Sequence, residues 1–452
     1  MALRRLLLAA AALSALSACG GPSPVDPQRQ IGPNPFLPDI HQYLIPPMHV
    51  PKVVGWGKAM PTVPAGLHLQ ALATGLKSPR SVYVLPNGDI LVVESGGPKS
   101  RVRRPKEIIM GWVQKRAHPA VEPGMDIILL RDADGDGTPE KRTLFLDHLT
   151  SPFGVVLVGN ELYVANTDGV MAYPYQTGDT QITAPGVKLT DLPAGPIDHH
   201  WTKSLTASPD GTKLYAGVGS NSNITENGIG AELDRASIWE IDRATGAHRE
   251  FATGLRNPNG LQFEPQTHTL WAVVNERDEL GPDLVPDYLT SVKDGAFYGW
   301  PYSYYGQHVD PRVRPQRPDL VAKAIAPDYA LSSHVAPLGM VFYTGANLPQ
   351  AYRGGAFVGE HGSWDRGKLN GYKVVYVPFA NGRPNGMAQD VVTGFVKDGK
   401  ALGRPVGLAV DTRGGLLIAD DGGGVVWRVT AASPTKVAMR RVGATTRRAG
   451  QG

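Results

Sequence analysis

The chain has one cysteine, Cys19, among its 452 residues. Because a disulfide needs two cysteines, an intrachain disulfide is excluded, and so is a cysteine nucleophile anywhere after residue 19. The apolar run from Leu6 to Leu16 is too short to span a bilayer. The chain also has little excess of positive over negative charge: its formal net charge is +4, and 19% of its residues are charged. Because this excess is small and scattered, the sequence does not indicate a nucleic-acid partner.

The N-terminus has the features of a targeting segment. Arg4 and Arg5 precede the apolar run, and small residues lead to Leu16-Ser17-Ala18-Cys19, which resembles a bacterial lipobox. The lone cysteine lies where a lipoprotein peptidase would leave it as the first residue. We therefore expect residues 1–18 to be a lipoprotein signal peptide and Cys19 to carry a lipid anchor to a membrane. The protein would then lie in the bacterial cell envelope, periplasm-facing or extracellular; plain secretion is the alternative.

Composition divides the rest of the chain into three parts. Residues 19–66 are rich in proline, which favours an extended, semi-rigid spacer between membrane and domain. We expect residues 67–430 to form one large domain and residues 431–452 to be a basic, disordered tail. Within the domain, residues 98–123 form a basic insertion around an apolar island; a solvated segment is the plain interpretation, and contact with anionic lipid or an electron acceptor the alternative.

One sequence frame recurs six times in this domain. Each copy has a start marked by proline or glycine, a short apolar strand, a turn and a returning strand, at intervals of about 65 residues. The copies begin near Pro79, Pro152, His200, Pro258, Pro337 and Pro405. No long apolar segment has the period of a helix, which argues against alternating strands and helices. The pattern predicts an all-β, six-bladed β-propeller; a multi-sheet sandwich is the alternative.

The first strand of each propeller blade lines the central channel, so residues at the same phase of the frame converge near one mouth. Cationic or imidazole side chains occur at or beside this phase in five of the six copies. They are Arg80, His200, Arg256 (followed by Asn257), His334 and Arg404. Any one of them alone would be solvated surface, but together they predict an anion-binding funnel for a ligand with carboxylates.

Two acidic segments are candidates for calcium. Asp132, Asp134 and Asp136 are spaced at i, i+2 and i+4 before Gly137, like the start of a calcium loop. Thr143 stands where an EF-hand would need a glutamate, so this is no EF-hand. We expect calcium at this loop to be structural, and an acidic turn without metal is the alternative. The segment 279–283, Glu-Leu-Gly-Pro-Asp, lies in a long insertion where backbone carbonyls suit a cation, although a plain turn has the same residues.

Two further segments are candidates for the walls of a site. Tyr298, Trp300, Tyr302, Tyr304 and Tyr305 suit sugar stacking, with a packed loop core as the alternative. The second segment, 359–366, brings His361, Trp364 and Arg366 together after a strand, and such loop clusters of polar residues are often functional.

Taken together, these motifs resemble the soluble sugar dehydrogenases that use pyrroloquinoline quinone, especially the L-sorbosone dehydrogenase-like branch and fungal pyranose dehydrogenases. The resemblance extends from about residue 67 to residue 429. It rests on residues 199–211 (His-His-Trp-Thr through Ser-Pro-Asp-Gly), 255–260 (Leu-Arg-Asn-Pro-Asn-Gly), 281–282 (Gly-Pro), 356–366, 371–375 and 403–405 (Gly-Arg-Pro).

The resemblance implies a six-bladed propeller that oxidises a sugar or sugar aldehyde, with the quinone over the channel mouth. His200 corresponds to the base that takes the hydroxyl proton, and Arg256 to the residue that stabilises the developing quinone oxyanion. The backbone carbonyls of Gly281 and Pro282 correspond to calcium ligands.

The remaining site residues correspond to cofactor contacts. These are Arg80, Asn257, His361, Trp364 and the carboxylate clamp Arg404, with His334 as a further candidate from its phase. Electrons would pass to an acceptor, a quinone or a cytochrome, that the sequence does not identify.

The chain departs from the glucose-oxidising branch at two positions. Val406 stands where that branch has a second arginine, and Ser220 where it has an aspartate, so we expect Asp198 to orient His200 instead. Two other functions compete with sugar oxidation. A calcium-dependent lactonase-type hydrolase would need carboxylates and asparagines at the channel mouth. A non-catalytic binding propeller would leave the base unexplained.

Overall fold

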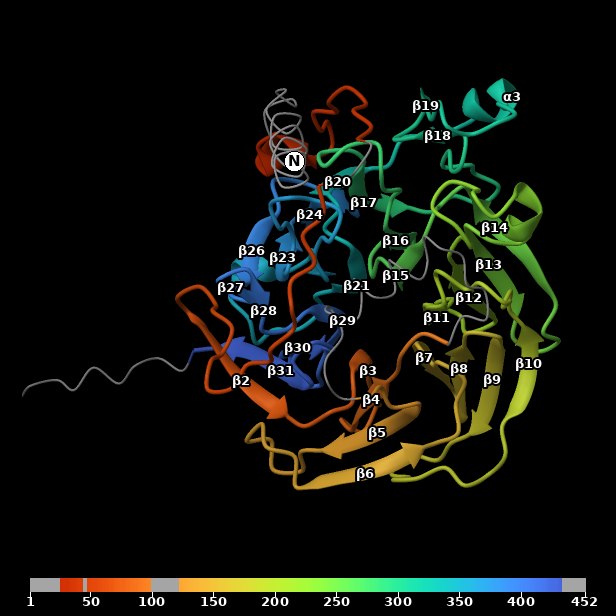
Figure 1. The fold of residues 1–452 in the computed structure, drawn as a ribbon. Helices are drawn as coiled ribbons and strands as arrows, with labels where there is room; N and C mark the ends of the chain where they lie inside the picture. The colour runs from red at the N-terminus through yellow and green to blue at the C-terminus, as the bar shows by residue number, and fades with distance from the viewer. Residues whose placement is uncertain (1–24, 44–46, 99–121, 433–452) are drawn as a thin grey trace, which may run out of the picture.

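The computed structural model describes residues 25–43, 47–98 and 122–432. They form a ring of six β-sheets around a central axis (Figure 1), which confirms the predicted six-bladed propeller. The first strand of each sheet is innermost, and each inner strand contacts the inner strands of its two neighbours. Cys19, the signal segment, nearly all of the basic insertion and the tail from residue 433 lie outside the described residues.

The blades follow the chain in order. Blade 1 contains β3 (Pro79–Val84), β4 (Ile90–Glu94), β5 (Asp126–Arg131) and β6 (Lys141–Leu146). Blade 2 contains β7 (Gly154–Val158), β8 (Glu161–Asn166), β9 (Gly169–Pro174) and β10 (Val187–Asp191). Blade 3 contains β11 (Leu205–Ala207), β12 (Lys213–Val218), β13 (Ser237–Asp242) and β14 (His248–Thr253).

The last three blades have the same plan with additions. Blade 4 contains β15 (Pro258–Phe263), β16 (Leu270–Val274), β17 (Pro286–Ser291), β20 (Tyr329–Ser333) and the short β1 (Ile31–Gly32). Blade 5 contains β21 (Pro337–Phe342), β22 (Ala356–Glu360), β23 (Lys373–Val377) and β26 (Gln389–Val392). Blade 6 contains β29 (Pro405–Val410), β30 (Leu416–Asp420), β31 (Val425–Ala431) and β2 (Leu67–Ala73).

Short elements decorate the loops. Three small hairpins are formed by β18 (Ser303–Tyr304) with β19 (His308–Val309), β24 (Phe379–Ala380) with β25 (Arg383–Pro384), and β27 (Val396–Lys397) with β28 (Lys400–Ala401). The helical turns are η1 (Pro27–Gln30), η3 (Ile229–Glu232), α3 (Pro318–Val321) and η4 (Gln350–Tyr352). Among the described residues, no helix is long and apolar enough to cross a membrane.

Burial of apolar residues between blades holds the ring together. Each pair of adjacent blades shares a buried cluster; blades 1 and 2, for example, bury Leu91 and Phe145 against Leu162. The axis itself is filled by Phe153, Leu338 and Val406, with Trp201 packed against them. The ring closes where β2 pairs with β31, so that a strand from the start of the domain completes the last blade. This closure leaves no open end between the first and last blades.

The described part of the proline-rich segment packs on the propeller. We call residues 25–43 and 47–66 the N-terminal strap. Strand β1 pairs with β20, Val53 bridges to Ala401, and Thr62 bridges to Thr393. Trp56 is 7% exposed, and its Nε1 donates to Asp420 at 2.6 Å. These residues of the expected semi-rigid spacer therefore pack on blades 4, 5 and 6, where they have both apolar and hydrogen-bonding partners.

Candidate active site

His200 lies just before β11, where the third blade reaches the channel mouth. Its Nδ1 lies 2.8 Å from the carbonyl oxygen of Ser220, an acceptor, so Nδ1 carries the proton and Nε2 is left as a proton acceptor. Burial, with the charge of Arg256, holds the pKa of His200 well below its usual value. The ring is therefore neutral at pH 7, as a general base must be.

A backbone carbonyl, rather than the expected carboxylate, orients His200. Asp198 pairs instead with Arg235, its Oδ1 lying 2.8 Å from the guanidinium, so the expectation that Asp198 orients His200 is wrong. The Ser220 hydroxyl lies 3.1 Å from the same Nδ1 and itself donates to the carbonyl of Ser222.

Asn257 and Arg256 approach the same place from the start of blade 4. A Cβ added to Gly219 would lie 2.4 Å from Asn257 Oδ1 and 2.5 Å from His200 Cβ, so only glycine allows these two side chains to converge. Arg256 donates to the carbonyl of Glu276 at 2.7 Å and to Asn223 Oδ1 at 3.1 Å, and lies 3.3 Å from Asp278 Oδ2. The guanidinium is thus fixed in orientation beside the base.

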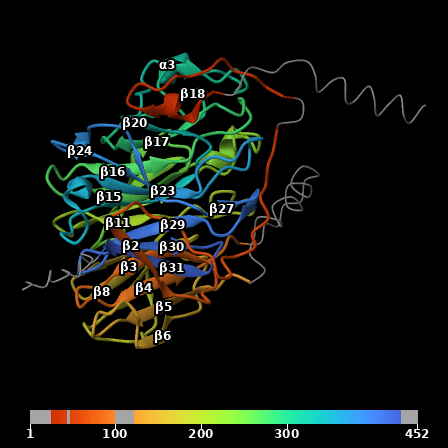
Figure 2. The ribbon, with the colours of Figure 1, turned by 90° about the vertical axis from the view of Figure 1, so that its left-hand side faces the viewer.

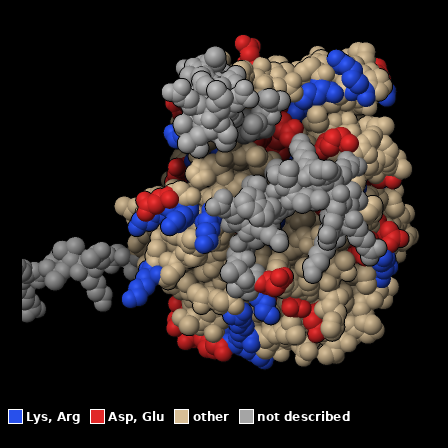
Figure 3. Space-filling view, in the orientation of Figure 1, with Lys and Arg blue, Asp and Glu red and all other residues tan. Residues whose placement is uncertain are grey.

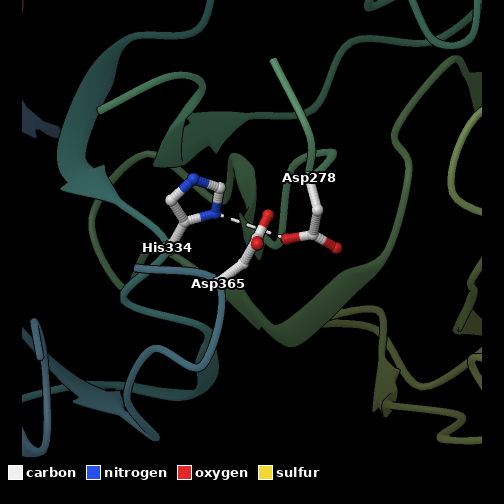
Figure 4. Close-up of side chains that lie close together, drawn as sticks. All are labelled: Asp278, His334 and Asp365. Carbon is white, nitrogen blue, oxygen red and sulfur yellow. Dashed lines mark ion pairs between the residues drawn. The ribbon is translucent and has the colours of Figure 1, made fainter. Parts of the chain in front are cut away.

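Asp278, His334 and Asp365 form a compact group next to Arg256. Figure 4 shows the imidazole of His334 and the two carboxylates converging, with His334 Nδ1 3.3 Å from Asp278 Oδ1. One ligand atom from each residue lies within 4.8 Å of the other two, a spacing that suits a metal ion.

The pKa values of this group follow from mutual contact. Burial lowers the pKa of His334, but the hydrogen bond and charge of Asp278 outweigh it and raise that pKa to about 9. Burial and the nearby charge of Asp278 raise the pKa of Asp365 to about 7. Asp278 itself is kept ionised, because His334 and Arg256 outweigh its burial and lower its pKa. At neutral pH, Asp278 is therefore negatively charged, His334 is positively charged, and Asp365 is partly protonated.

A second charged group closes the other side of the mouth. Asp421 is in ion-pair contact with Arg80 and accepts from His361 Nε2 at 3.0 Å. Burial, with the charge of Arg404, lowers the pKa of His361 to about 4, so this ring is neutral at pH 7. Arg404 donates to the carbonyl of His361 at 3.1 Å and to that of Gly362 at 3.2 Å.

The predicted cationic funnel is therefore partly neutralised. Arg80 and Arg256 each pair with a carboxylate, and His334 does the same. Within the described part of the chain, Arg404 makes no ion pair; it stacks 5.5 Å from the ring of Tyr372. On the visible described surface of this face, basic and acidic residues are interspersed (Figure 3).

Gly281 and Pro282 lie where the blade 4 loop meets the N-terminal strap. The carbonyl of Gly281 faces His334 Nε2 at 3.2 Å, which brings it beside the Asp278 group. Both residues line a small, open hollow, together with Glu279 and Asp365. Trp364 is half-buried, and its carbonyl accepts from the amide of His49 in the strap at 3.1 Å.

Other candidate segments lie elsewhere. Four of the five aromatic residues proposed to stack on sugars are buried, namely Tyr298, Trp300, Tyr304 and Tyr305, so that interpretation is wrong and the packed loop core is correct. Val406 is fully buried with Phe153 and Leu338 on the axis, which explains why an apolar residue stands there.

The acidic loop predicted to bind calcium lies between β5 and β6, on the outer edge of blade 1. Asp132, Asp134 and Asp136 gather there with Glu140, their ligand oxygens within 4.8 Å of one another. The Asp132 carboxylate also accepts from the amides of Gly135 at 2.7 Å and Gly137 at 3.0 Å, as it would in a turn without metal. Calcium at this loop stays a prediction.

Sequence reasoning missed the two carboxylates that organise the site, Asp278 and Asp421. Both follow the second strand of a blade, β16 and β30, and Ser220 and His361 follow β12 and β22 in the same way. The second strand runs back toward the mouth, so its end faces the start of the first strand. The phase argument used for the strand starts would have found these residues had it been applied to the ends of the second strands as well.

Comparison with known proteins shows the family of the chain. A family model described as "Glucose / Sorbosone dehydrogenase" matches residues 76–365, and a "TrAA12-like" model matches residues 317–432. A protein of Borreliella burgdorferi without an assigned function is 28% identical over 294 residues, which are 62% of this chain and 76% of that protein.

Solved structures show the same fold. The holo pyranose dehydrogenase PQQ domain from Coprinopsis cinerea superposes with a TM-score of 0.65 at 20% identity, covering 82% of this chain and 97% of that domain. A calcium structure of a Trichoderma reesei carbohydrate-active enzyme of family AA12 gives 0.66 at 21% identity, covering 82% and 97%. The family model spans well over half of the chain, and the chain therefore belongs to the glucose/sorbosone dehydrogenase family.

Proposed function

We propose that this protein oxidises a sugar or sugar aldehyde with pyrroloquinoline quinone and calcium, using His200 as the general base. The observation that carries the proposal is the hydrogen bond from His200 Nδ1 to the Ser220 carbonyl, which leaves Nε2 basic at the channel mouth. Family membership and the fold shared with the pyranose dehydrogenase domain support the same reaction class.

The residues at the mouth fit a quinone with three carboxylates. Arg80 Nε and Asn257 Oδ1 are buried polar atoms that have no partner among the described residues. Such atoms are costly unless a ligand or water completes them. Arg404 uses its described hydrogen bonds on backbone carbonyls alone, so donors remain for a carboxylate. Arg80, Asn257, His361, Trp364 and Arg404 would hold the cofactor.

Calcium fits the oxygen-rich corner beside this group. The Gly281 carbonyl lies 3.2 Å from His334 of the Asp278 group, Pro282 and Asp365 line the same hollow, and hard oxygen ligands suit a hard cation. His334, which lies between Asp278 and the Gly281 carbonyl, would have to release its proton or turn if the ion binds at that carbonyl.

The chain's own residues supply the proton transfer and the charge stabilisation. Bound pyrroloquinoline quinone would supply the acceptor for the hydride that leaves the sugar carbon. His200 Nε2 takes the proton of the sugar hydroxyl, and the Ser220 carbonyl stabilises the imidazolium that results. Arg256, held by Glu276, Asn223 and Asp278, presents fixed positive charge where negative charge develops.

The competing functions fit the geometry less well. A lactonase-type site would hold calcium directly with carboxylates and asparagines at the channel mouth, whereas here Asp421 pairs with Arg80 and His361, and Asp278 pairs with Arg256 and His334. A non-catalytic binding propeller would not need, beside a fixed arginine, a neutral imidazole whose Nε2 bonds to none of the residues that the structure describes.

We also propose attachment to a membrane through lipid on Cys19, in the cell envelope, with electrons leaving to a quinone or cytochrome. The lipobox-like Leu16-Ser17-Ala18-Cys19 supports the anchor.

A titration tests cofactor binding directly. Adding pyrroloquinoline quinone and calcium to the purified protein should change the visible absorption of the quinone with saturation at one equivalent. In the Arg404→Met variant we expect saturation to need a higher concentration. A wild-type spectrum equal to the sum of protein and free quinone would rule the proposal out.

A further inference from the structure

The first residues of the N-terminal strap are bonded to blade 4 beside the proposed site. The amide of Val25 donates to the carboxylate of Asp283 at 3.2 Å. Gln30, which is fully buried, donates to the backbone carbonyl of Asp283 and accepts from the hydroxyl of Ser333 in β20. Asp283 is also in ion-pair contact with Arg366 of the blade 5 loop. Because these buried polar groups would be costly to separate, the strap is fixed to the propeller from residue 25 onward.

This attachment shortens the tether that a lipid on Cys19 would leave. A free spacer from residue 19 to residue 66 would have 47 residue steps and reach about 160 Å when extended. Only six steps separate Cys19 from Val25, and they span at most about 20 Å. An anchored propeller would therefore be held close to the bilayer, with the outer edge of blade 4 nearest to it. A short tether also keeps that edge at a high effective concentration near the lipid, so even a weak contact would be populated.

Exposed apolar side chains gather on this edge of the ring. Phe36 is 41% exposed, Val309 48% and Met387 49%. The sulfur of Met387 lies beside the strap, 3.6 Å from where a Cβ on Gly32 would be. Val309 belongs to the β18–β19 hairpin, and Leu37 of the strap packs on a buried cluster that includes Tyr304 of β18. Figures 1 and 2 show the start of the strap, in red, beside β18 and α3 at one edge, with β6 at the opposite edge.

The charged residues of this edge nearly offset one another. Three exposed cations make no ion pair with any described residue, namely Arg29, Arg314 and Lys323. The guanidinium of Arg29 lies 4.2 Å from the centroid of the Phe36 ring. Figure 3 shows lysine and arginine side chains over β18 and α3. Asp26 and Asp39 are exposed on the same strap, so apolar contact, more than charge, must favour a lipid surface here.

We infer that this edge of blade 4 is a membrane-docking surface. Phe36, Val309 and Met387 enter the boundary between headgroups and acyl chains, and Arg29 reaches the headgroup phosphates along the Phe36 ring. The occupant is the bilayer that would hold the lipid of Cys19, so the inference rests on the proposed anchor and is independent of sugar oxidation. Since Asp283 binds Val25, the blade 4 loop of the proposed site would also lie close to the bilayer.

The lone cysteine makes this surface open to a direct test. When Cys19 is acylated, a cysteine introduced elsewhere is the only free thiol and can carry an environment-sensitive fluorophore. The labelled positions are Phe36→Cys and Met387→Cys, with Leu144→Cys as the control. Leu144 is 43% exposed, like Phe36, and lies in β6 at the opposite edge of the ring (Figure 1). The full lipoprotein, with its acylation checked by mass spectrometry, is reconstituted into vesicles of phosphatidylethanolamine and phosphatidylglycerol that contain a nitroxide in the upper acyl chain.

We expect the nitroxide to quench the fluorophore at residues 36 and 387 at least about threefold more than at residue 144, because docked side chains lie roughly 5–10 Å into the boundary. Added salt should change this little, and Phe36→Asp should lower the quenching at residue 387 to the control level. Equal quenching at residues 36 and 144 of acylated protein overturns the docking surface and leaves the anchor standing. A blue shift at residue 36 without quenching indicates a protein contact and also overturns it, and an unacylated Cys19 overturns both proposals.

Discussion

Replacing His200 by glutamine removes the base while keeping the local structure. A glutamine side chain has an amide that can donate to the Ser220 carbonyl, as Nδ1 does at 2.8 Å in the wild type, but it has no basic nitrogen. We expect the sugar and the quinone to bind about as well as before. What the variant loses is the acceptor for the hydroxyl proton.

The size of the loss follows from the state of the wild-type ring. Because the pKa of His200 lies below its usual value of about 6.5, more than roughly three quarters of the molecules hold the base form at pH 7. The full contribution of general-base catalysis therefore operates at neutral pH. We expect kcat to fall by about 10²–10⁴-fold, equivalent to roughly 3–5 kcal/mol in the activation free energy.

The assay is steady-state, dye-linked sugar oxidation with cofactor occupancy checked by absorbance. The wild-type rate should decline only below pH 6.5, because protonation removes the base, and this acid limb should disappear in His200→Gln. His199→Ala is the matched control, since residue 199 is exposed whereas the ring of His200 is bonded to the carbonyl of Ser220. A His200→Gln enzyme that keeps more than a tenth of wild-type kcat, or a His199→Ala enzyme that is inactive, would refute the assignment.

Four more predictions follow from other parts of the molecule. Arg256→Met should lower kcat by about 10²–10³-fold and move the acid limb toward neutral pH, because loss of the positive charge raises the pKa of His200; a pH–rate profile with an unmoved limb would contradict this. Trp56→Phe should lower the free energy of unfolding by about 1–3 kcal/mol in urea, because buried Asp420 loses its 2.6 Å hydrogen bond; an unchanged midpoint would mean that the strap is not anchored there. Lys203→Met should raise the free energy of unfolding by about 1–4 kcal/mol at pH 7, because burial lowers the pKa of Lys203 to about 7 in the folded chain. The unfolded chain binds this proton up to about pH 10.5, so wild-type stability rises between pH 7 and pH 10.5 and the gain must shrink over that range. Finally, Cys19 should carry a diacylglyceryl group by mass spectrometry of the mature protein, and a free N-terminus at another residue would exclude the anchor.

The fold could be predicted because its signals are local. Five of the six inner strands begin at a proline or a glycine, and a second short apolar strand follows each of them. Pro79, Pro258, Pro337 and Pro405 are the first residues of β3, β15, β21 and β29. The same phase placed His200, Arg256 and Arg404 at the mouth, because equal phase in a propeller means an equal height along the axis.

The pairings within the site were beyond this reasoning because they form between blades. Asp421 follows β30 but contacts Arg80 of β3, and Asp278 follows β16 but contacts His334 before β21. The partner of His200 is a carbonyl of the backbone, which every residue has, so no residue type marks it. Proline content predicted a spacer, but it carries no information about the surface against which residues 25–43 and 47–66 pack.

Dye-linked sugar oxidation before and after cofactor removal tests the central claim most directly. Protein stripped with a chelator and dialysed should have no activity toward D-glucose, D-galactose, D-xylose or maltose, and quinone and calcium added together should restore it. Restoration should fail in His200→Gln although the quinone still binds. Full activity in the stripped protein, or none after both additions, would contradict the account.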